Sequence, residues 1–492
     1  MRVFITGATG LVGRALTMRL RRDGHTVVAW SRSADRVVQR LGGEAIPASG
    51  GSADMLAAID GCDAVVTLAG EPILPGRWTA RRKASMRKSR VDLNEAVLAA
   101  ITKADRPPGV ILAGSAVGFY GDTKSKVVSE DDGPGEGYLA ELNQDWEAVF
   151  APAVARGIRV VWARTGIVLA PDGGALESLL PIARLGLSGP MGSGRQGVPW
   201  IHIDDHIESL MLALRSPDAR GPINLVGPES VTQREFASAI GRALGRPAFV
   251  PTPSIVMMGL LGEASSVLLE GQFVQPKRLT SLGFVHRFQT LDDALQDILS
   301  TTQVTLTNLS TTPAVDHGAN YLRQAPPTHE LTTSRLVPSP VADVWAFFSD
   351  ARNLANLSPQ NAGMTMGEAP SSVTKGSRFS HRLALGPVTV PWDGEIVACT
   401  PEERFVDIQH RGPFRTWWHE HGLEKMTLPD GTSGTRLTDR VLFRSPLGPI
   451  GRAATWAYVG PQLLSLFAYR DLTLRRRFGE AHSTHTQRGT TP

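Results

Sequence analysis

The stretch Met1-Arg2-Val3-Phe4-Ile5-Thr6-Gly7-Ala8-Thr9-Gly10-Leu11-Val12-Gly13 decides the fold of this chain. Its first five residues have the pattern of a short buried strand, and a helical pattern through residues 14–22 follows the glycines. Strand, glycine-rich turn and helix in this order begin a dinucleotide-binding unit. Gly7 permits the tight turn, Gly10 lets the backbone approach a pyrophosphate, and Gly13 lets the helix pack close to the strand. The helix N-terminus then presents free N–H groups and a positive dipole end to the phosphates.

The end of the second predicted strand indicates which nucleotide is bound. Thr26–Trp30 is apolar and is followed by Ser31 and Arg32, with no acidic residue before Asp35. A site for NAD(H) usually has Asp or Glu here, bonded to the ribose 2′-hydroxyl, whereas a guanidinium suits a 2′-phosphate. The sequence therefore favours NADP(H), with Arg32 as a solvated loop residue being the alternative.

Composition limits the class of protein. The 492 residues suggest two or three domains, and 42% hydrophobic with 20% charged residues is typical of a globular chain. Two cysteines form no disulfide framework, and a strand begins at residue 1, so we expect a cytoplasmic protein without a signal peptide. No apolar run reaches membrane-spanning length, because Gly259, Gly262 and Glu263 interrupt the best candidate, residues 255–269. The basic run of residues 77–90 has no interleaved aromatic residue other than Trp78, so we expect a solvated helix face and no nucleic-acid partner.

The order of predicted elements divides the chain. Strand runs alternate with helical patterns in residues 1–298, which predicts an α/β Rossmann domain with a doubly wound parallel sheet and a small substrate lobe at about 249–298. Residues 299–328 are rich in Ser, Thr and Asn and are interpreted as a flexible linker. Residues 329–480 run strand, helix, several strands and a long helix, which predicts an α+β domain; residues 481–492 are expected to be a disordered tail.

Four further segments resemble the extended short-chain dehydrogenase/reductases, and in particular the atypical, SDR39U1-like epimerase family. They are Leu68-Ala69-Gly70-Glu71-Pro72-Ile73, Gly114-Ser115-Ala116-Val117-Gly118-Phe119-Tyr120-Gly121-Asp122, Arg164-Thr165-Gly166-Ile167-Val168-Leu169 and Pro199-Trp200-Ile201-His202-Ile203-Asp204-Asp205. The resemblance covers about residues 1–298. It implies that the backbone at 68–70 lines the adenosine and ribose, and that Arg90 and Val168 contact the cofactor. The cofactor-binding residues expected are therefore Thr6, Gly7, Thr9, Gly10, Leu11, Val12, Gly13, Ser31, Arg32, Leu68, Ala69, Gly70, Arg90 and Val168.

The second domain resembles the START-like, helix-grip (SRPBCC, polyketide cyclase/dehydrase type) superfamily. The similar residues are Pro338–Phe348, Phe405-Val406-Asp407 with Gly412-Pro413-Phe414, and Thr438-Asp439-Arg440-Val441. The resemblance implies a cavity for a hydrophobic ligand, lined by aromatic residues that recur on the strand runs; an ordinary aromatic core is the alternative. These residues are Phe379, Trp392, Phe405, Phe414, Trp417, Trp418 and Phe443.

The catalytic residues depart from the short-chain dehydrogenase pattern, in which a tyrosine and a lysine four residues later transfer the proton. Tyr138 is followed four residues later by Leu142, and the helix after it has no lysine. Ser115 closes the strand that delivers the catalytic serine in the resembled fold, and Tyr120 offers a second phenol. The catalytic candidates are thus Ser115, Tyr120 and Tyr138. For each of them a purely structural role is the alternative.

Two groups of residues that contain histidine allow more than one interpretation. His202 and Asp204 point to the same side of a strand, as an acid–base pair or a structural histidine held by a carboxylate. His419 and His421 share a strand face that is either ligand-facing or exposed, and we expect no metal site. The sequence predicts an NADP(H)-dependent oxidoreductase or epimerase acting on a carbonyl or sugar-like small molecule. A non-catalytic NADPH-binding protein and an apolar-ligand carrier with a Rossmann scaffold are the alternatives.

Overall fold

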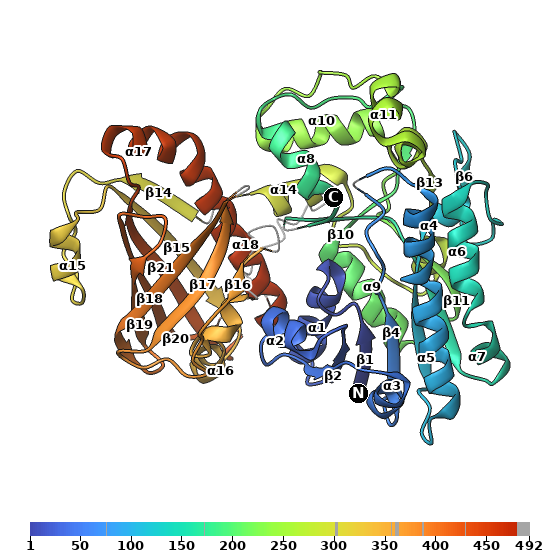
Figure 1. Ribbon diagram of the computed structural model, residues 1–492, viewed down its shortest axis with the longest axis horizontal. Helices are drawn as coiled ribbons and strands as arrows, with labels where there is room; N and C mark the ends of the chain where they lie inside the picture. The colour runs from blue at the N-terminus through green and yellow to red at the C-terminus, as the bar shows by residue number, and fades with distance from the viewer. Residues whose placement is uncertain are drawn as a thin grey trace, which may run out of the picture. The chain divides into compact units, whose positions relative to one another are not determined.

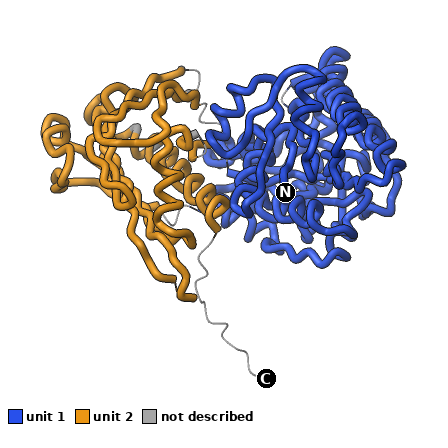
Figure 2. The backbone as a smooth tube through the Cα atoms, turned by 90° about the horizontal axis from the view of Figure 1, so that it is seen from below, with its two compact units in different colours: residues 1–300 blue, residues 301–492 orange. Residues whose placement is uncertain are grey.

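The computed structural model describes residues 1–74, 76–171, 173–300, 304–355, 357–359, 364–385, 388–428 and 430–479. The chain forms two compact units, Met1–Ser300 and Thr301–Pro492 (Figure 2). Each unit has its own sheet and its own hydrophobic core. The expectation for the tail at 481–492 lies outside the described residues.

The first unit is built on a seven-stranded, wholly parallel sheet (Figure 1). The strand order is β11-β7-β5-β4-β1-β2-β3, so β1 and β4 lie in the middle. The order confirms the parallel sheet that alternating strands and helices predicted. The strands are β1 (Arg2–Thr6), β2 (Thr26–Trp30), β3 (Ile46–Ala48), β4 (Ala64–Thr67), β5 (Val110–Ala116), β7 (Arg159–Thr165) and β11 (Gly221–Leu225).

Helices cover both faces of this sheet, because residues along β1 alternate between two cores. Val3 and Ile5 pack with residues of α1 and α9, whereas Phe4 packs with residues of α3, α5 and the segment before α7. Every side chain of the strand is thereby removed from water, which is typical of a parallel sheet. These helices are α1 (Leu11–Arg22), α2 (Ala34–Leu41), α3 (Ser52–Ile59), α4 (Ala80–Lys88), α5 (Val91–Lys103), α6 (Tyr138–Ala148), α7 (Ala151–Ala155) and α9 (Ile203–Arg215).

Short elements beyond the carboxyl ends of the strands form the rest of this unit. Three two-stranded pairs, β6–β13, β8–β10 and β9–β12, tie together segments far apart in sequence. The strands are β6 (Val127–Val128), β8 (Ile167–Ala170), β9 (Gly197–Val198), β10 (Trp200–His202), β12 (Val231–Thr232) and β13 (Phe273–Val274). The helices are η1 (Val117–Tyr120), α8 (Gly174–Arg184), α10 (Gln233–Leu244), α11 (Ser254–Leu261), η2 (Gly262–Ser265), α12 (Ser266–Leu269), α13 (Lys277–Ser281) and α14 (Leu291–Leu299).

The second unit contains an eight-stranded antiparallel sheet, ordered β14-β15-β21-β20-β19-β18-β17-β16. Its strands are β14 (Val304–Asn308), β15 (His329–Val337), β16 (Thr365–Met366), β17 (Arg378–Leu385), β18 (Val388–Thr400), β19 (Arg404–Arg411), β20 (Thr416–Thr427) and β21 (Ser433–Arg444). Its helices are α15 (Ala319–Gln324), α16 (Val341–Phe348), η3 (Ala351–Ala355), α17 (Gly448–Ala454), η5 (Thr455–Val459) and α18 (Gly460–Phe478). The strand and helix runs expected between residues 329 and 480 are confirmed.

The long helix α18 packs its apolar side chains on this sheet. Leu463 and Phe467 belong to one core with Val441 and Phe443 of β21, and Leu474 packs in a second core with residues of β15 and β19. Polar side chains on the same face of α18 as Leu463, Phe467 and Leu474 therefore lie between the helix and the sheet.

The segment expected to be a flexible linker is structured over most of its described length. Val304–Asn308 forms β14, which pairs antiparallel with β15, and α15 buries Leu322 against the sheet. Val304 and Leu306 alternate with threonines, so one face of a strand is apolar although the composition is polar. The linker interpretation was wrong for these residues, because it used composition and overlooked this period of two.

Candidate functional site

The glycine turn between β1 and α1 leaves no room for side chains at two of its glycines. Gly7 has φ +76°, and a Cβ there would lie 2.7 Å from the backbone nitrogen of Ala69. A Cβ on Gly13 would overlap the carbonyl oxygen of Gly7. Gly7 is thus required by its positive φ and its approach to the next strand, and Gly13 by the contact of helix with turn. The tight turn at Gly7 is the role that the sequence predicted; at Gly13 the close contact is with the turn itself and not with strand β1.

The N-cap residue of α1, Gly10, makes no side-chain cap hydrogen bond, and the first turn of the helix contains no acidic residue. Gly10 N–H donates to the Gly7 carbonyl at 3.0 Å, and Arg14 N–H donates to the Gly10 carbonyl at 2.9 Å. Such a terminus favours an anion through its free donors and its dipole.

Basic residues gather beyond the end of β2. Arg32 is exposed in the loop after Trp30 and Ser31. Burial lowers the pKa of Arg40 on α2, and the neighbouring charges of Arg14 and Arg36 lower it further. Two guanidiniums, those of Arg14 on α1 and Arg36 on α2, therefore act electrostatically on Arg40.

The carboxyl end of β4 lies against the glycine turn. Leu68 N–H donates to the carbonyl of Thr6 at 3.0 Å, and Ala69 N–H approaches the Thr6 hydroxyl at 3.4 Å. Arg90 covers Gly70 so closely that a Cβ on Gly70 would be 3.0 Å from the guanidinium carbon. The structure therefore brings Leu68, Ala69, Gly70 and Arg90 together beside the turn, as the resemblance implied.

Leu11 connects this edge to β8. Its side chain lies against Gly173 and Gly174, which follow β8, and Leu11, Val12 and Val168 pack on the same core. The expected cofactor residues on β1, α1, β4 and β8 thus lie at one edge of the sheet. Thr9 is half-buried within the turn.

Ser115 belongs to a buried polar network that the sequence did not predict. Its hydroxyl donates to Glu147 Oε1 of α6 at 2.6 Å, and Arg164 of β7 donates to both carboxylate oxygens of Glu147 at 2.8 Å. The guanidinium lies 3.5 Å from the centre of the Phe119 ring. Arg164 therefore holds Glu147 in a bidentate ion pair, and this pair fixes the position of the carboxylate that accepts the Ser115 hydrogen bond.

Tyr120 is a member of the same network. Its hydroxyl donates to Asn224 Oδ1 at 2.8 Å and accepts from Arg164 Nη1 at 3.0 Å, and the residue is only 4% exposed. Burial raises the pKa of Tyr120, against the lowering effect of Arg164 and Asn224. The proton of this phenol is already committed to Asn224, so the geometry favours a structural role.

Tyr138 has a more open environment at the first residue of α6. Its half-buried hydroxyl donates to the carbonyl of Lys83 at 2.9 Å, and the Lys83 ammonium lies 4.7 Å from the ring centre. Burial raises the pKa of Tyr138, and the nearby charge of Arg90 opposes this shift. Arg90 thus places a positive charge near the phenol although Leu142 stands where short-chain dehydrogenases have lysine.

His202 is a structural residue. Its Nδ1 accepts the backbone N–H of Asp204 at 3.1 Å and so caps α9, and its ring packs against the Phe288 ring with a centroid separation of 3.8 Å and a tilt of 33°. Nε2 lies 3.4 Å from a carboxylate oxygen of Asp297. The side chain is fully buried, so the structure favours the interpretation as a held histidine over an acid–base pair.

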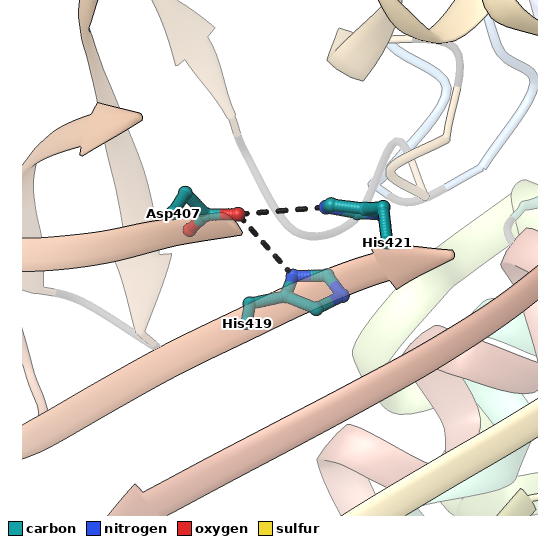
Figure 3. Close-up of side chains that lie close together, drawn as sticks. All are labelled: Asp407, His419 and His421. Atoms are coloured by element: carbon teal, nitrogen blue, oxygen red, sulfur yellow. Dashed lines mark ion pairs between the residues drawn. The ribbon is translucent and has the colours of Figure 1, made fainter. Parts of the chain in front are cut away.

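The second unit contains a buried group of charged and imidazole side chains between the sheet and α18. Asp407 of β19 faces His419 and His421 of β20 (Figure 3), and Asp439 of β21 contacts both histidines from the other side. Both histidines are about 5% to 6% exposed, so the exposed-face alternative is wrong. The sequence indicated that the two histidines share a face. Their partners Asp407 and Asp439 could be identified only from the register of the three strands in the structure.

The aromatic residues of the second unit pack mainly against one another. Trp392, Trp417, Phe414 and Phe443 form a chain of ring contacts with centroid separations of 4.9–6.2 Å. Trp418 lies in a different core with Leu322 of α15, because its neighbour Trp417 takes the opposite side of the strand. The expectation that all seven aromatic residues line one cavity is thus wrong for Trp418.

No helix in the described ranges is both long enough and apolar enough to cross a membrane. Cys62 and Cys399 are both free thiols.

Comparison with known proteins covers the first unit. The model of the NAD dependent epimerase/dehydratase family matches residues 3–227, and a domain of unknown function, DUF1731, matches residues 252–298. The chain is 42% identical over 294 residues to epimerase family protein MT2273 of Mycobacterium tuberculosis, covering 60% of this chain and 96% of that protein. It is 38% identical over 304 residues to human epimerase family protein SDR39U1, covering 61% of this chain and all of that protein.

The solved structures include the same human relative. The crystal structure of human SDR39U1 (isoform 2) with NADPH is 37% identical, with a TM-score of 0.55, and covers 61% of this chain and 99% of that one. Its fold confirms the Rossmann architecture, and the relatives are matched over nearly their whole length. Through its first 60%, the chain belongs to the SDR39U1-like epimerase family of the short-chain dehydrogenase/reductases.

Proposed function

We propose that the first unit binds NADP(H) across the glycine turn and is an epimerase-family oxidoreductase acting on a small carbonyl or sugar-like molecule. The observation that carries this proposal is the turn itself. Gly7 and Gly13 leave no space for a Cβ, and the uncapped N-terminus of α1 offers donors to a pyrophosphate. The NADPH in the structure of human SDR39U1 supports the same assignment.

The proposed preference for NADP(H) over NAD(H) rests on the charges beyond β2. Arg32 follows the strand with no acidic residue before Asp35, and Arg14, Arg36 and Arg40 add positive potential nearby. A ribose 2′-phosphate carries negative charge that these guanidiniums stabilise, and a 2′-hydroxyl does not. The remaining contacts proposed are those of Thr6–Gly13, Ser31, Leu68–Gly70, Arg90 and Val168.

NADPH would supply hydride to a carbonyl carbon. For the proton we propose Tyr138, because its hydroxyl is half-buried and bonded only to a backbone carbonyl, with Arg90 supplying nearby positive charge. Ser115 would orient the substrate oxygen from a position fixed by Glu147. Tyr120 we assign to the support of this arrangement, since its hydroxyl is saturated by Asn224 and Arg164.

The test is NADPH oxidation by the full chain over a panel of aldehydes, ketones and nucleotide sugars. Tyr138→Phe and Ser115→Ala should each reduce kcat by at least about 100-fold, which is the usual range for a lost acid–base group, and leave the Kd for NADPH unchanged. Tyr120→Phe serves as the matched control and should lower stability more than turnover. Equal activity of Tyr138→Phe and the native chain would contradict the assignment.

A non-catalytic, NADPH-binding sensor is the second function that a specific observation favours. Helix α6 has no lysine, and the hydroxyl of Tyr120 is held inside a buried network. Tight NADPH binding with no oxidation of NADPH by any member of the panel would support this function over the oxidoreductase.

We further propose that residues 329–480 form a START-like helix-grip domain for a hydrophobic ligand. The antiparallel sheet and the long α18 packed on it support this proposal. The structured β14 and α15 mean that the unit begins at about residue 304. A saturable rise in Tm of the full chain with long-chain acyl or isoprenoid probes, in the absence of NADPH, would favour the carrier function; no rise with any apolar probe would contradict the ligand-binding proposal.

We propose a cytoplasmic location for the protein, in accord with its two free thiols.

A further inference from the structure

Asp407 is a buried carboxylate to which no described residue donates a hydrogen bond. It is 7% exposed, and its Oδ2 faces His421 Nε2 at 3.4 Å and His419 Nδ1 at 3.7 Å (Figure 3). Charge-assisted N–H···O bonds are about 2.7–2.9 Å long, so neither contact has hydrogen-bond length. A carboxylate in this position needs a cation, because an unpaired buried charge is costly.

Asp439 contacts one nitrogen of each ring. Its Oδ1 lies 3.0 Å from His419 Nε2 and 2.9 Å from His421 Nδ1. A carboxylate offers only acceptors, so His419 Nε2 carries hydrogen in the neutral ring and His419 Nδ1 presents a lone pair to Asp407. His421 Nδ1 has two neighbours, because Arg470 Nη2, which can only donate, also lies 3.2 Å from it. In the His421 tautomer that donates from Nδ1 to Asp439, Nε2 presents a second lone pair to Asp407.

In that tautomer the three electron-pair donors of Asp407, His419 and His421 lie within 4.8 Å of one another. Nitrogens and oxygens bound to one zinc ion at about 2.0–2.2 Å in tetrahedral geometry lie about 3.3–3.6 Å from each other. The separations of 3.4 and 3.7 Å between Asp407 and the two rings are close to this range. A carboxylate that holds the remote N–H of a metal-ligating histidine is the usual supporting contact at such centres. Asp439 makes this contact to His419 and, in the tautomer described above, to His421.

Strand register produces the arrangement. His419 pairs directly with Asp407 across β19 and β20, and His421 pairs with Asp439 across β20 and β21. Because His419 and His421 are two residues apart, all four side chains lie on the face that α18 covers. Phe467 of α18 contacts the His419 ring at 5.7 Å, which closes the group on its helix side.

The charges nearby leave room for a cation. Arg470 of α18 approaches Asp439 Oδ1 at 3.5 Å and His421 Nδ1 at 3.2 Å, on the side away from Asp407. It compensates one of the two carboxylates. Asp407 remains as the uncompensated charge of this group, and it is the carboxylate that faces the lone pairs.

We propose that Asp407, His419 and His421 bind one divalent transition metal ion of the Zn²⁺ or Fe²⁺ class, with Asp439 as the carboxylate that orients both histidines. Mixed nitrogen and oxygen donors suit these ions and disfavour Mg²⁺ and Ca²⁺, which prefer oxygen. Three protein ligands leave at least one coordination position open, as in catalytic rather than structural zinc sites. This position would take water or an oxygen atom of a ligand. The sequence expectation of no metal site is replaced by this proposal.

The second group of three possible ligands, His202, Asp204 and Asp297, lacks these properties. The Nδ1 lone pair of His202 is already occupied by the backbone N–H of Asp204. Its Nε2 therefore carries the proton and cannot ligate. His421 differs from His202, because Asp439 Oδ1 lies 2.9 Å from its Nδ1 and can accept a hydrogen there, which leaves Nε2 free to ligate.

The test uses the untagged full chain, stripped with chelator and titrated with Zn²⁺ and Co²⁺. The native chain should bind about one ion per chain with a visible Co²⁺ absorption band, and Asp407→Asn and His421→Gln should lose this band. Asp439→Asn keeps all three ligands and should bind about 10- to 100-fold more weakly. His410→Gln is the matched control, since His410 is an exposed histidine of the same strand as Asp407 and should bind like the native chain.

Anomalous scattering at the zinc edge from crystals of the native chain provides a measurement without substitutions. A peak between Asp407, His419 and His421 would support the proposal even if the variants fail to fold. Absence of saturable binding to the native chain, or equal binding by the native chain and Asp407→Asn, would overturn it.

Discussion

The substitution Gly10→Ala separates cofactor binding from folding. Gly10 has φ −81° and ψ 178°, which any residue adopts, and the nearest atom to a Cβ at this position is the Gly7 carbonyl oxygen at 3.3 Å. The added methyl group therefore fits with a shift of a few tenths of an ångström. It points into the space in which we propose the pyrophosphate lies.

The expected magnitudes follow from these contacts. Alanine is a poorer N-cap than glycine, so the free energy of unfolding should fall by about 1 kcal/mol, or about 2–4 °C in Tm. Loss of one hydrogen bond between a backbone N–H and a charged phosphate costs about 1.5–3 kcal/mol, which is roughly 10- to 150-fold in Kd. The effect on binding should thus exceed the effect on stability.

The assay is calorimetric titration of NADPH into each variant, with Tm measured on the same samples. Gly43→Ala is the matched control, because no heavy atom of the described residues lies within 4 Å of a Cβ there. Gly13→Ala should instead lower stability, since its Cβ would overlap the backbone of Gly7. A folded Gly10→Ala variant that binds NADPH with the native Kd would refute the placement of the pyrophosphate.

Three further predictions test other parts of the first unit. Arg32→Ala should weaken NADPH binding about 10- to 150-fold and leave NADH binding unchanged. Equal losses for the two dinucleotides would contradict a contact between Arg32 and the 2′-phosphate. Glu147→Gln leaves the buried Arg164 without its counter-charge and should cost about 3–5 kcal/mol in urea unfolding, and Glu147→Gln with Arg164→Met should recover part of it. Burial lowers the pKa of His206 to about 3, so the unfolded chain takes up a proton below about pH 6.5 that the folded chain refuses. Stability should therefore fall by about 2 kcal/mol between pH 7 and pH 5, and His206→Gln should reduce this slope; an unchanged slope would contradict the burial of a neutral ring.

The cofactor edge was predictable because its determinants are local. The strand, the glycines and the helix that follow one another in residues 1–22 define the turn without reference to the rest of the chain. The end of β4 could be placed by resemblance, because parallel strands of this fold all end at the same edge. Gly70 and Arg90 then meet as the structure shows.

The polar networks were not predictable because their members are distant in sequence. Glu147 and Arg164 lie on a helix and a strand, and nothing in either segment marks them as partners. Asp407 and Asp439 reach His419 and His421 only through the register of three antiparallel strands. A pattern of two histidines two residues apart was visible, and the carboxylates that give it chemical meaning were not.

β14 shows a different limit of sequence interpretation. The strand has the polar composition of a linker. Val304 and Leu306 nevertheless pack in an apolar core of the second unit, and the strand pairs with β15 at the edge of the sheet. Composition over a long window concealed a strand of only five residues. Alternation within the short window would have revealed it.

Native mass spectrometry of the untagged full chain, with NADPH and NADH added in turn, tests the central claim most directly. The account predicts one dinucleotide per chain, with NADPH retained at lower concentrations than NADH and lost from Gly10→Ala. A native chain that retains neither dinucleotide would contradict the assignment of the glycine turn as a cofactor site.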